Sequence, residues 1–421
     1  MRKIPRIAAL AAGFACAAAG ALAIAGPASA TGTSSASPAT PVYAKVCANT
    51  TGPRCLAIVN RTASQHSELA MAKGANATPD GLGPTDIQSA YNLSGGASGG
   101  TVALIEAGNY PSIEQDLQTY RNQYGLSQCT KANGCLKVVN MNGQTSPLPS
   151  NDNDWAVETA LDMDAVSSAC PACHILVVEA PSENDVQSML TFDRNMATAN
   201  ASAAKLGAKA SSNSWGDKPS LEKYATDSAV QAGYNQPSMV TAVSSGDDGK
   251  DGGITVPSSF TSVVAVGGTT LKKDSSARGW TETAWNGAGS GCSKKIKAPS
   301  WQSSIKACNG KRALTDVSAV ADPATGLAIY GPDPYGGSGS QWQVVGGTSL
   351  SSPLVAAIYT RAGNTGSGSA VHNASSLYSH TADLNDVTSG NNGSCGAPVC
   401  TAGKGWDGPT GLGTPNGLGA F

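Results

Sequence analysis

The stretch VVGGTSLSSPLVAA, Val344 to Ala357, places Ser349 between a pair of glycines and an apolar run. Glycines in this position are typical of a tight turn, and the apolar run predicts a helix that begins at this serine. Ser349 can be the N-cap of that helix, or it can be a nucleophile, which needs a general base. The chain has only four histidines, and none stands in a context that marks it as the base.

The N-terminal 30 residues, MRKIPRIAALAAGFACAAAGALAIAGPASA, have a basic start, an apolar stretch and a small-residue site at Ala28-Ser29-Ala30. This pattern predicts a secretory signal peptide over residues 1–30. No later segment approaches the roughly 18 consecutive apolar residues of a membrane span, so we expect a soluble, secreted, extracellular protein. The net charge of −2, with 13% charged residues, indicates neither a nucleic-acid nor a membrane partner. We expect a monomer.

The cysteines also indicate an oxidising compartment. Of eleven cysteines, Cys16 lies in the predicted signal peptide, which leaves an even number in the mature chain. Connectivity does not follow from sequence alone, but the ten cysteines form five close neighbours, and we predict these as disulfides. The predicted pairs are Cys47–Cys55, Cys129–Cys135, Cys170–Cys173, Cys292–Cys308 and Cys395–Cys400. Zinc is the alternative for Cys170-Pro-Ala-Cys173, although no second CxxC accompanies it.

Residues 31–80 are first rich in Ala, Thr, Ser and Pro, and we interpret them as a short pro-segment or a loosely packed N-terminal arm. From residue 81 to 421, short apolar runs alternate with helix-like segments, which predicts an α/β domain with a mostly parallel central sheet and helices on both faces. The first predicted helix is TDIQSAYNL, capped by Thr85 or Asp86. Three more are predicted over residues 154–169, 183–199 and 224–235.

Two acidic clusters stand out. In VETALD, Glu158 and Asp162 lie four residues apart on a predicted helix and therefore share a face. Alone, the pair is typical of a solvated acidic helix start. In SSGDDG, a predicted strand runs into two aspartates, the first of which is Asp247, between glycines. Alone, this pattern is typical of a turn.

Taken together, the three clusters resemble the sedolisins, the serine-carboxyl peptidases. The resemblance lies in the order Glu-x-x-x-Asp, Gly-Asp-x-Gly and Gly-Thr-Ser-x-x-x-Pro, with SNSWG, VVAVGGTTL and GKGWDGPTGLGTP as supporting stretches. It covers about Pro79 to Phe421. It implies a subtilisin-like fold and a secreted, acid-active endopeptidase that cleaves protein or peptide substrates through an acyl-enzyme.

The resemblance also implies the site residues. Ser349 is the nucleophile, Glu158 the general base, Asp162 the residue that orients Glu158, and Asp247 the acid of the oxyanion site. Asp247 must carry a proton to donate a hydrogen bond, and a carboxylate base of ordinary pKa near 4 suits acid conditions. We therefore expect a bell-shaped activity profile with its maximum at roughly pH 3 to 5.

Further positions follow from the same resemblance. The substrate-binding residues are Ser214, Trp215 and Gly216 of SNSWG. A calcium site is implied in the C-terminal tail, where carboxylates and glycine and valine carbonyls supply hard oxygen ligands. Its expected ligands are Asp386, Val387, Gly403, Gly405 and Asp407.

The sequence departs from the sedolisin pattern in two places. Members of that family usually have a folded pro-domain of well over a hundred residues, whereas residues 31–80 are short. In the primary specificity pocket, where some members have an acid, GGITVPSS offers Thr255. The short pro-segment keeps a second hypothesis open, which is a secreted sedolisin-like protein that binds peptides without turnover.

Overall fold

The structure is a computed structural model, and it describes residues 40–47, 52–72, 77–97, 99–252, 255–337, 339–365, 368–369 and 371–421. The predicted signal peptide lies outside the described residues. Residues 41–421 form one compact unit. No helix in the described ranges is both long and apolar enough to cross a membrane.

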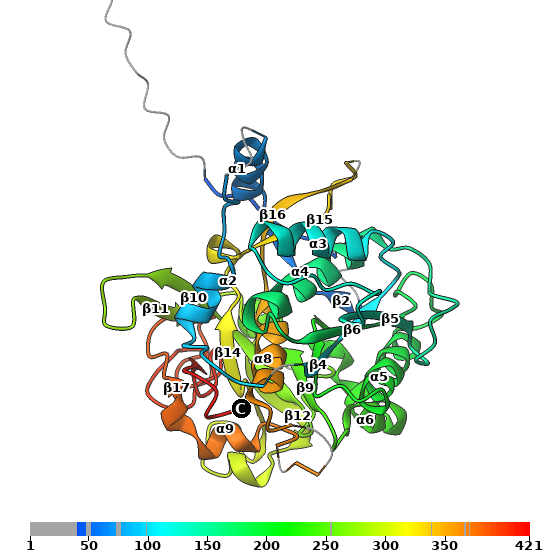
Figure 1. Cartoon of the computed structure of the whole chain (residues 1–421). Helices are drawn as coiled ribbons and strands as arrows, with labels where there is room; N and C mark the ends of the chain where they lie inside the picture. The colour runs from blue at the N-terminus through cyan, green and yellow to red at the C-terminus, as the bar shows by residue number, and fades with distance from the viewer. Residues whose placement is uncertain are drawn as a thin grey trace, which may run out of the picture. The chain divides into compact units, whose positions relative to one another are not determined.

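A central sheet of eight strands forms the middle layer (Figure 1). Its strand order is β11-β10-β9-β7-β4-β6-β5, and β14 pairs with β10 beside this path. All neighbours run parallel except β11, which is antiparallel to β10. The strands are β4 (Thr101–Ala107), β5 (Leu136–Asn140), β6 (His174–Ala180), β7 (Ala210–Asn213), β9 (Val240–Ser244), β10 (Val264–Lys273), β11 (Trp280–Ala284) and β14 (Val317–Val320).

The burial of these strands explains their sequences. Strands β4 and β6 are buried at every position after the first. Parallel strands that are covered on both faces have continuous apolar runs rather than alternation, and TVALI and ILVV are such runs. The prediction of a mostly parallel sheet with helices on both faces is confirmed.

Two pairs of helices pack on the sheet. Helices α4 (Asn153–Ala169) and α8 (Thr348–Ala362) contact each other, while α5 (Met189–Lys205) contacts α6 (Ser228–Tyr234) and strands β4 and β6. Helix α5 begins later than predicted because the Ser188 side chain accepts the Thr191 amide and caps the helix there.

The start of helix α2 (Pro84–Ala90) also differs from the predicted start. The predicted cap is Thr85 or Asp86, but the N-cap is Gly83, and Pro84 occupies the first turn. Asp86 lies at the third helical position, where its Oδ2 accepts the Gly83 amide at 3.0 Å. The acid therefore acts as the reciprocal half of a capping box rather than as the cap.

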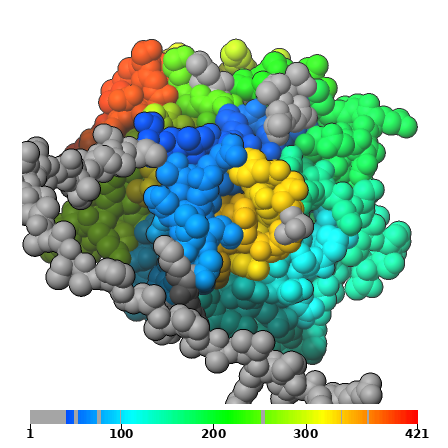
Figure 2. All heavy atoms as spheres, turned by 90° about the horizontal axis from the view of Figure 1, so that it is seen from above, coloured from blue at the N-terminus to red at the C-terminus, as the bar shows by residue number. Residues whose placement is uncertain are grey.

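A second sheet contains the N-terminal part of the described chain. Its order is β1-β3-β16-β15, with β1 (Tyr43–Lys45), β3 (Ile58–Asn60), β15 (Leu327–Pro332) and β16 (Ser340–Gly346). Helix α1 (Arg61–Met71) follows β3 and packs on β16. Figure 2 shows these blue N-terminal residues against the yellow ones of β15 and β16. The described part of residues 31–80 is therefore packed on the domain and is not a loose arm.

Smaller elements complete the fold, and the five predicted disulfides are all present. The Cys170–Cys173 disulfide excludes the zinc alternative, because both thiols take part in the disulfide.

The short strands pair as β2 (Arg54–Cys55) with β8 (Trp215–Gly216), β12 (Gly291–Lys297) with β13 (Lys311–Leu314), and β17 (Leu384–Asn385) with β18 (Thr414–Pro415). The remaining α-helices are α3 (Ile113–Gln123), α7 (Gly249–Gly252) and α9 (Ser375–Ser379).

Candidate active site

The turn between β16 and α8 positions Ser349. Gly347 is the N-cap of α8 with φ of +97°, a left-handed conformation that favours glycine. A Cβ at Gly347 would lie 2.0 Å from the Leu56 carbonyl oxygen, so no larger residue fits. Ser349 is the second residue of α8, and its buried Oγ donates to the Ser214 carbonyl oxygen at 3.1 Å. Ser349 is therefore not the helix N-cap, and its hydroxyl is available for another role.

Helix α4 supplies two fully buried carboxyl groups, Glu158 and Asp162, one turn apart. Oε2 of Glu158 accepts the backbone amides of Leu56 at 3.1 Å and Ala57 at 2.8 Å. Burial raises the pKa of Glu158 well above its ordinary value, and the charge of Asp162 adds to this, whereas the Ser349 hydroxyl and the Ala57 amide oppose it. The alternative of a solvated acidic helix start is excluded by this burial.

Asp162 is linked to Ser349 through Ser214. The Ser214 hydroxyl contacts both carboxyl oxygens of Asp162, at 2.8 and 2.9 Å, while the Ser214 carbonyl accepts the Ser349 hydroxyl. Burial raises the pKa of Asp162 to about 8, against the opposing effect of the Ser214 hydrogen bond. Glu158 and Asp162 interact strongly, so below neutral pH the pair retains protons and titrates as one unit.

Asp247 lies three residues beyond the end of β9. Its Oδ1 accepts the Thr348 amide at 2.8 Å and the Thr348 hydroxyl at 2.7 Å. Its Oδ2 is buried and has no hydrogen-bond partner in the described part of the chain. Burial raises the pKa of Asp247 to about 7. Below that pH the proton belongs on Oδ2, since Oδ1 is already an acceptor, and Oδ2 can then donate.

Sequence reasoning missed two further acids. Glu106 at the end of β4 is fully buried, and burial raises its pKa well above the ordinary value, with further contributions from Asp162 and Glu158. Glu179 is its register neighbour on β6, and burial raises the pKa of Glu179 to about 7. The available signal was an acid at the carboxyl end of a continuous apolar strand, where sites in parallel sheets collect.

The predicted substrate-binding residues lie beside these groups. Trp215 and Gly216 form β8, which pairs antiparallel with β2, and the Ser214 carbonyl accepts the Leu56 amide at 3.2 Å. Gly216 and Thr255 line a cavity of about 260 Å³ that Asp247 also reaches. Asp217 and Lys218, which the sequence analysis did not single out, are charged residues that line the same cavity.

No histidine joins this cluster. His66 is exposed beside Asp80, His174 opens β6 at the surface, and the His380 ring contacts the Ser376 carbonyl. Among the described contacts, none joins a histidine, His372 included, to Ser349. The groups near Ser349 that could act as a base are therefore the carboxyl groups of Glu158 and Asp162.

Known proteins with similar sequences and structures identify the family of this chain. The model of the subtilase family, Peptidase_S8, matches residues 149–405, which include Glu158, Asp162, Asp247 and Ser349. The chain belongs to the subtilase family. The predicted resemblance to sedolisins is confirmed as well.

Two relatives cover most of this subtilase. Sedolisin from Pseudomonas sp. (strain 101) is 29% identical over 390 residues, which are 85% of this chain and 62% of the relative. Kumamolisin from Bacillus sp. (strain MN-32) is 27% identical over 374 residues, 82% of this chain and 64% of the relative. The chain thus spans less than two thirds of the length of either relative.

A solved structure is also similar. Pseudomonas sedolisin, a serine-carboxyl proteinase complexed with two molecules of pseudo-iodotyrostatin, matches with a TM-score of 0.66 and 28% identity, over 81% of this chain and 96% of that one.

The subtilase's C-terminal tail brings together the expected calcium ligands. Oδ2 of Asp386 accepts the Gly405 amide at 2.9 Å, and Oδ2 of Asp407 accepts the Gly403 amide at 3.1 Å. Burial raises the pKa of Asp407 to about 7, and the nearby charge of Asp386 adds to it. Val387 follows Asp386 and is buried. The described residues contain no group of three or more His, Cys, Asp or Glu side chains with metal-site spacing, so backbone carbonyls must complete any cation site.

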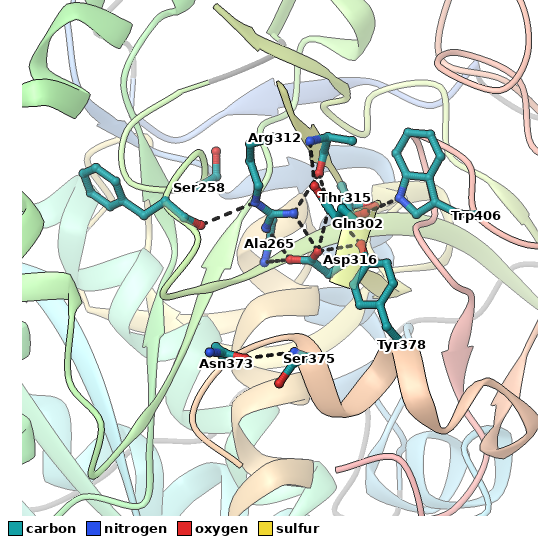
Figure 3. A network of polar contacts seen from close by, with 12 residues as sticks. Ser258, Ala265, Gln302, Arg312, Thr315, Asp316, Asn373, Ser375, Tyr378 and Trp406 are labelled. Atoms are coloured by element: carbon teal, nitrogen blue, oxygen red, sulfur yellow. Dashed lines mark hydrogen bonds and ion pairs between the residues drawn. The ribbon is translucent and has the colours of Figure 1, made fainter. Parts of the chain in front are cut away.

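A buried polar network holds this tail against the sheet (Figure 3). Arg312 and Asp316 form a fully buried ion pair, and Tyr378 donates to Asp316 at 2.9 Å. Thr315, next to Asp316, accepts the Trp406 indole N–H at 2.8 Å through its carbonyl. Because Trp406 precedes Asp407, the network fixes the loop that carries one of the expected calcium ligands.

Proposed function

We propose that this subtilase is a secreted, acid-active serine-carboxyl endopeptidase. The observation that supports the proposal is the convergence of Ser349, Glu158, Asp162 and Asp247, from three different parts of the chain, around Ser214 and the Gly347 turn. The five disulfides and the predicted signal peptide support secretion.

The chemistry follows from the positions of these groups. Ser349 Oγ attacks the substrate carbonyl carbon while Glu158 takes the hydroxyl proton. The oxygen that becomes negative receives hydrogen bonds from protonated Asp247 Oδ2 and from the Ser349 amide at the start of α8. Glu158 returns the proton to the leaving amine, and water then hydrolyses the Ser349 ester with Glu158 again as base. Asp162 orients Glu158 and retains the shared proton.

This mechanism predicts the dependence of activity on pH. Asp247 must be protonated, so activity falls as pH rises through about 7. Full protonation of the Glu158 and Asp162 pair removes the base and lowers activity as pH falls, and burial, which raises the pKa of both groups, moves this limb upward from the ordinary carboxyl range. The bell therefore extends further toward neutrality than the maximum at roughly pH 3 to 5 expected for carboxyl groups of ordinary pKa. Hydrolysis of a denatured protein between pH 3 and 8 measures it, with Ser349→Ala as the blank. A Ser349-dependent optimum at pH 8 with negligible hydrolysis at pH 4 contradicts the carboxyl mechanism.

We also propose that the C-terminal tail binds Ca²⁺. The carboxylates of Asp386 and Asp407 lie close together, and with the carbonyls of Val387, Gly403 and Gly405 they supply the oxygen ligands that calcium prefers. A bound cation would relieve the repulsion between the two acids and hold the loop between β17 and β18.

Removal of calcium should therefore lower the stability of the fold without directly affecting the hydrolysis step. A cation that binds only the folded state stabilises it by about 2.7 kcal/mol at one hundred times its Kd, so a chelator should lower Tm by several degrees. Scanning calorimetry with and without calcium measures this. Asp386→Asn should lose the calcium response, whereas Asp274→Asn, an exposed acid that bonds Ser276, should keep it. An identical Tm with and without chelator argues against the site.

A further inference from the structure

Strand β8 lies between the cavity beside Asp247 and helix α5. Successive residues of a strand point to opposite faces. Gly216 faces the cavity, since a Cβ added to it would lie 3.2 Å from the Thr255 hydroxyl oxygen. On the other face, the Trp215 ring makes a T-shaped contact with Phe192 of α5, with ring centroids 5.3 Å apart. Helix α5 therefore supports from behind the strand that carries the predicted substrate-binding residues.

Two acids meet at the same contact. Asp193 follows Phe192 on α5 and is fully buried, and Asp217 follows β8, two residues after Trp215, and is 4% exposed. Their carboxyl groups lie within hydrogen-bonding contact of each other. None of their four oxygens has a hydrogen-bond partner among the other described residues. The contact between α5 and β8 therefore depends on the interaction of these two carboxyl groups.

The two carboxyl groups attract each other only while the pair holds a proton. Two buried carboxylates repel, whereas a carboxyl group that carries a proton can donate it to the other. Burial raises the pKa of Asp193 to about 7, against the opposing effect of its hydrogen bond with Asp217. Burial raises the pKa of Asp217 well above its ordinary value, and the charge of Asp193 adds to this. In acid, the pair therefore holds a proton and joins α5 to β8.

Neither carboxyl group of the pair bonds a basic side chain within the described ranges. From the start of α6, the charge of Asp227 raises the pKa of Asp193 further, and Asp227 is itself paired with Arg194 at 2.6 Å. Tyr234 of α6 remains neutral, because burial raises its pKa well above the ordinary value. The other charged residues of the cavity that Asp217 lines are Arg54, Asp247, Asp248 and Lys218. These surroundings favour a proton, rather than an ion pair, between the two acids.

We infer that Asp193 and Asp217 form a carboxyl clamp, in which a shared proton positions β8 against α5 for substrate binding. The inference rests on the proposed peptidase function. It gives both acids a positioning role, because the clamp acts through the strand and makes no described hydrogen bond with Ser349. The clamp should therefore affect KM, whereas Asp247 and Glu158 act on kcat.

The first test compares Asp193→Ala with Asp193→Asn in the full chain. Asp193 is the better target because it lies behind β8, whereas Asp217 also lines the cavity. Alanine leaves the buried Asp217 carboxyl group without a partner, so β8 must move to let water reach it, and the substrate must return the strand to its place as it binds. KM for a quenched peptide at pH 5 should rise about tenfold in Asp193→Ala, with kcat near the parent's. Asp193→Asn should restore the parent's KM, since its amide can still bond Asp217.

Asp185→Ala is the matched control for this comparison. Asp185 is exposed and lies eight residues before Asp193, so the variant removes one carboxyl group outside the clamp and should keep the parent's KM. Equal KM values for Asp193→Ala and the parent would overturn the inference. A fall in kcat with an unchanged KM would also overturn it, because a strand that positions the substrate acts on binding.

Hydrogen exchange reports on β8 without relying on hydrolysis. Backbone amides exchange faster where the local structure opens. Mass spectrometry should show faster exchange over residues 214–218 in Asp193→Ala and parent-like exchange in Asp193→Asn. Faster exchange in a chain that hydrolyses no peptide would support the clamp and reject the peptidase instead. Parent-like exchange in Asp193→Ala would exclude the clamp.

The shared proton is tested by the dependence of Tm on pH. An acid that keeps its proton when folded but releases it when unfolded lowers the folding equilibrium constant by up to about tenfold per pH unit. For Asp193 this loss runs from its ordinary pKa near 4 to about 7, whereas asparagine does not titrate. The Tm of Asp193→Asn, relative to the parent's, should therefore rise by about 3 °C or more between pH 5 and 8. A Tm difference that is the same at both pH values would overturn the inference, and this comparison holds even if Asp193→Ala does not fold.

Discussion

Ser349→Ala and Glu158→Gln should each reduce kcat for peptide hydrolysis by about 10⁶, because the nucleophile and its base act as one proton-transfer unit. The double variant should lose little more than either single variant, since members of one unit fail together. Initial rates on a denatured protein at acid pH measure the loss, and circular dichroism establishes that the variants fold.

Ser351→Ala is the matched control for this pair. Ser351 lies two residues further along α8, is equally buried, and donates only to the Thr348 carbonyl among its described side-chain bonds. It should retain most of the parent activity. Full activity in Ser349→Ala or Glu158→Gln would reject the assignment of nucleophile or base.

Asp247→Ala should lower kcat by about 10² to 10³, or about 2.7–4 kcal/mol of transition-state stabilisation, because it removes a donor to the developing oxyanion. Asp247→Asn should be milder, since an amide N–H can still donate from the same position. The activity of Asp247→Asn should also no longer fall as pH rises through about 7, because in the parent protein this fall reflects deprotonation of Asp247.

The comparison between the two Asp247 variants separates an oxyanion role from a structural one. The Thr348 amide and hydroxyl both donate to Asp247 Oδ1, and asparagine retains an acceptor for them whereas alanine does not. Pre-steady-state rates at saturating substrate isolate the chemical step. Rates for Asp247→Ala that equal the parent's would exclude the oxyanion role.

Local patterns were enough to predict much of the architecture. Continuous apolar runs predicted the buried parallel strands, and short spacings predicted all five disulfides. Boundaries were less predictable, because α2 and α5 begin where a particular side chain or amide is satisfied. From the sequence alone, Thr85, Asp86 and the acids before Ser188 are equally plausible positions for these helices to begin.

By itself, the sequence determined the order of the motifs that carry Glu158, Asp162, Asp247 and Ser349, because each motif is a local pattern of turn, strand or helix. Only the tertiary structure decided which distant groups meet. Glu106 joins Asp162 because β4 lies beside α4, and Leu56 reaches Ser214 and Gly347 because β3 pairs with β16. These contacts join residues that lie far apart in the sequence, with separations of 56 to about 290 positions. They depend on strand order and register, which the local patterns do not encode.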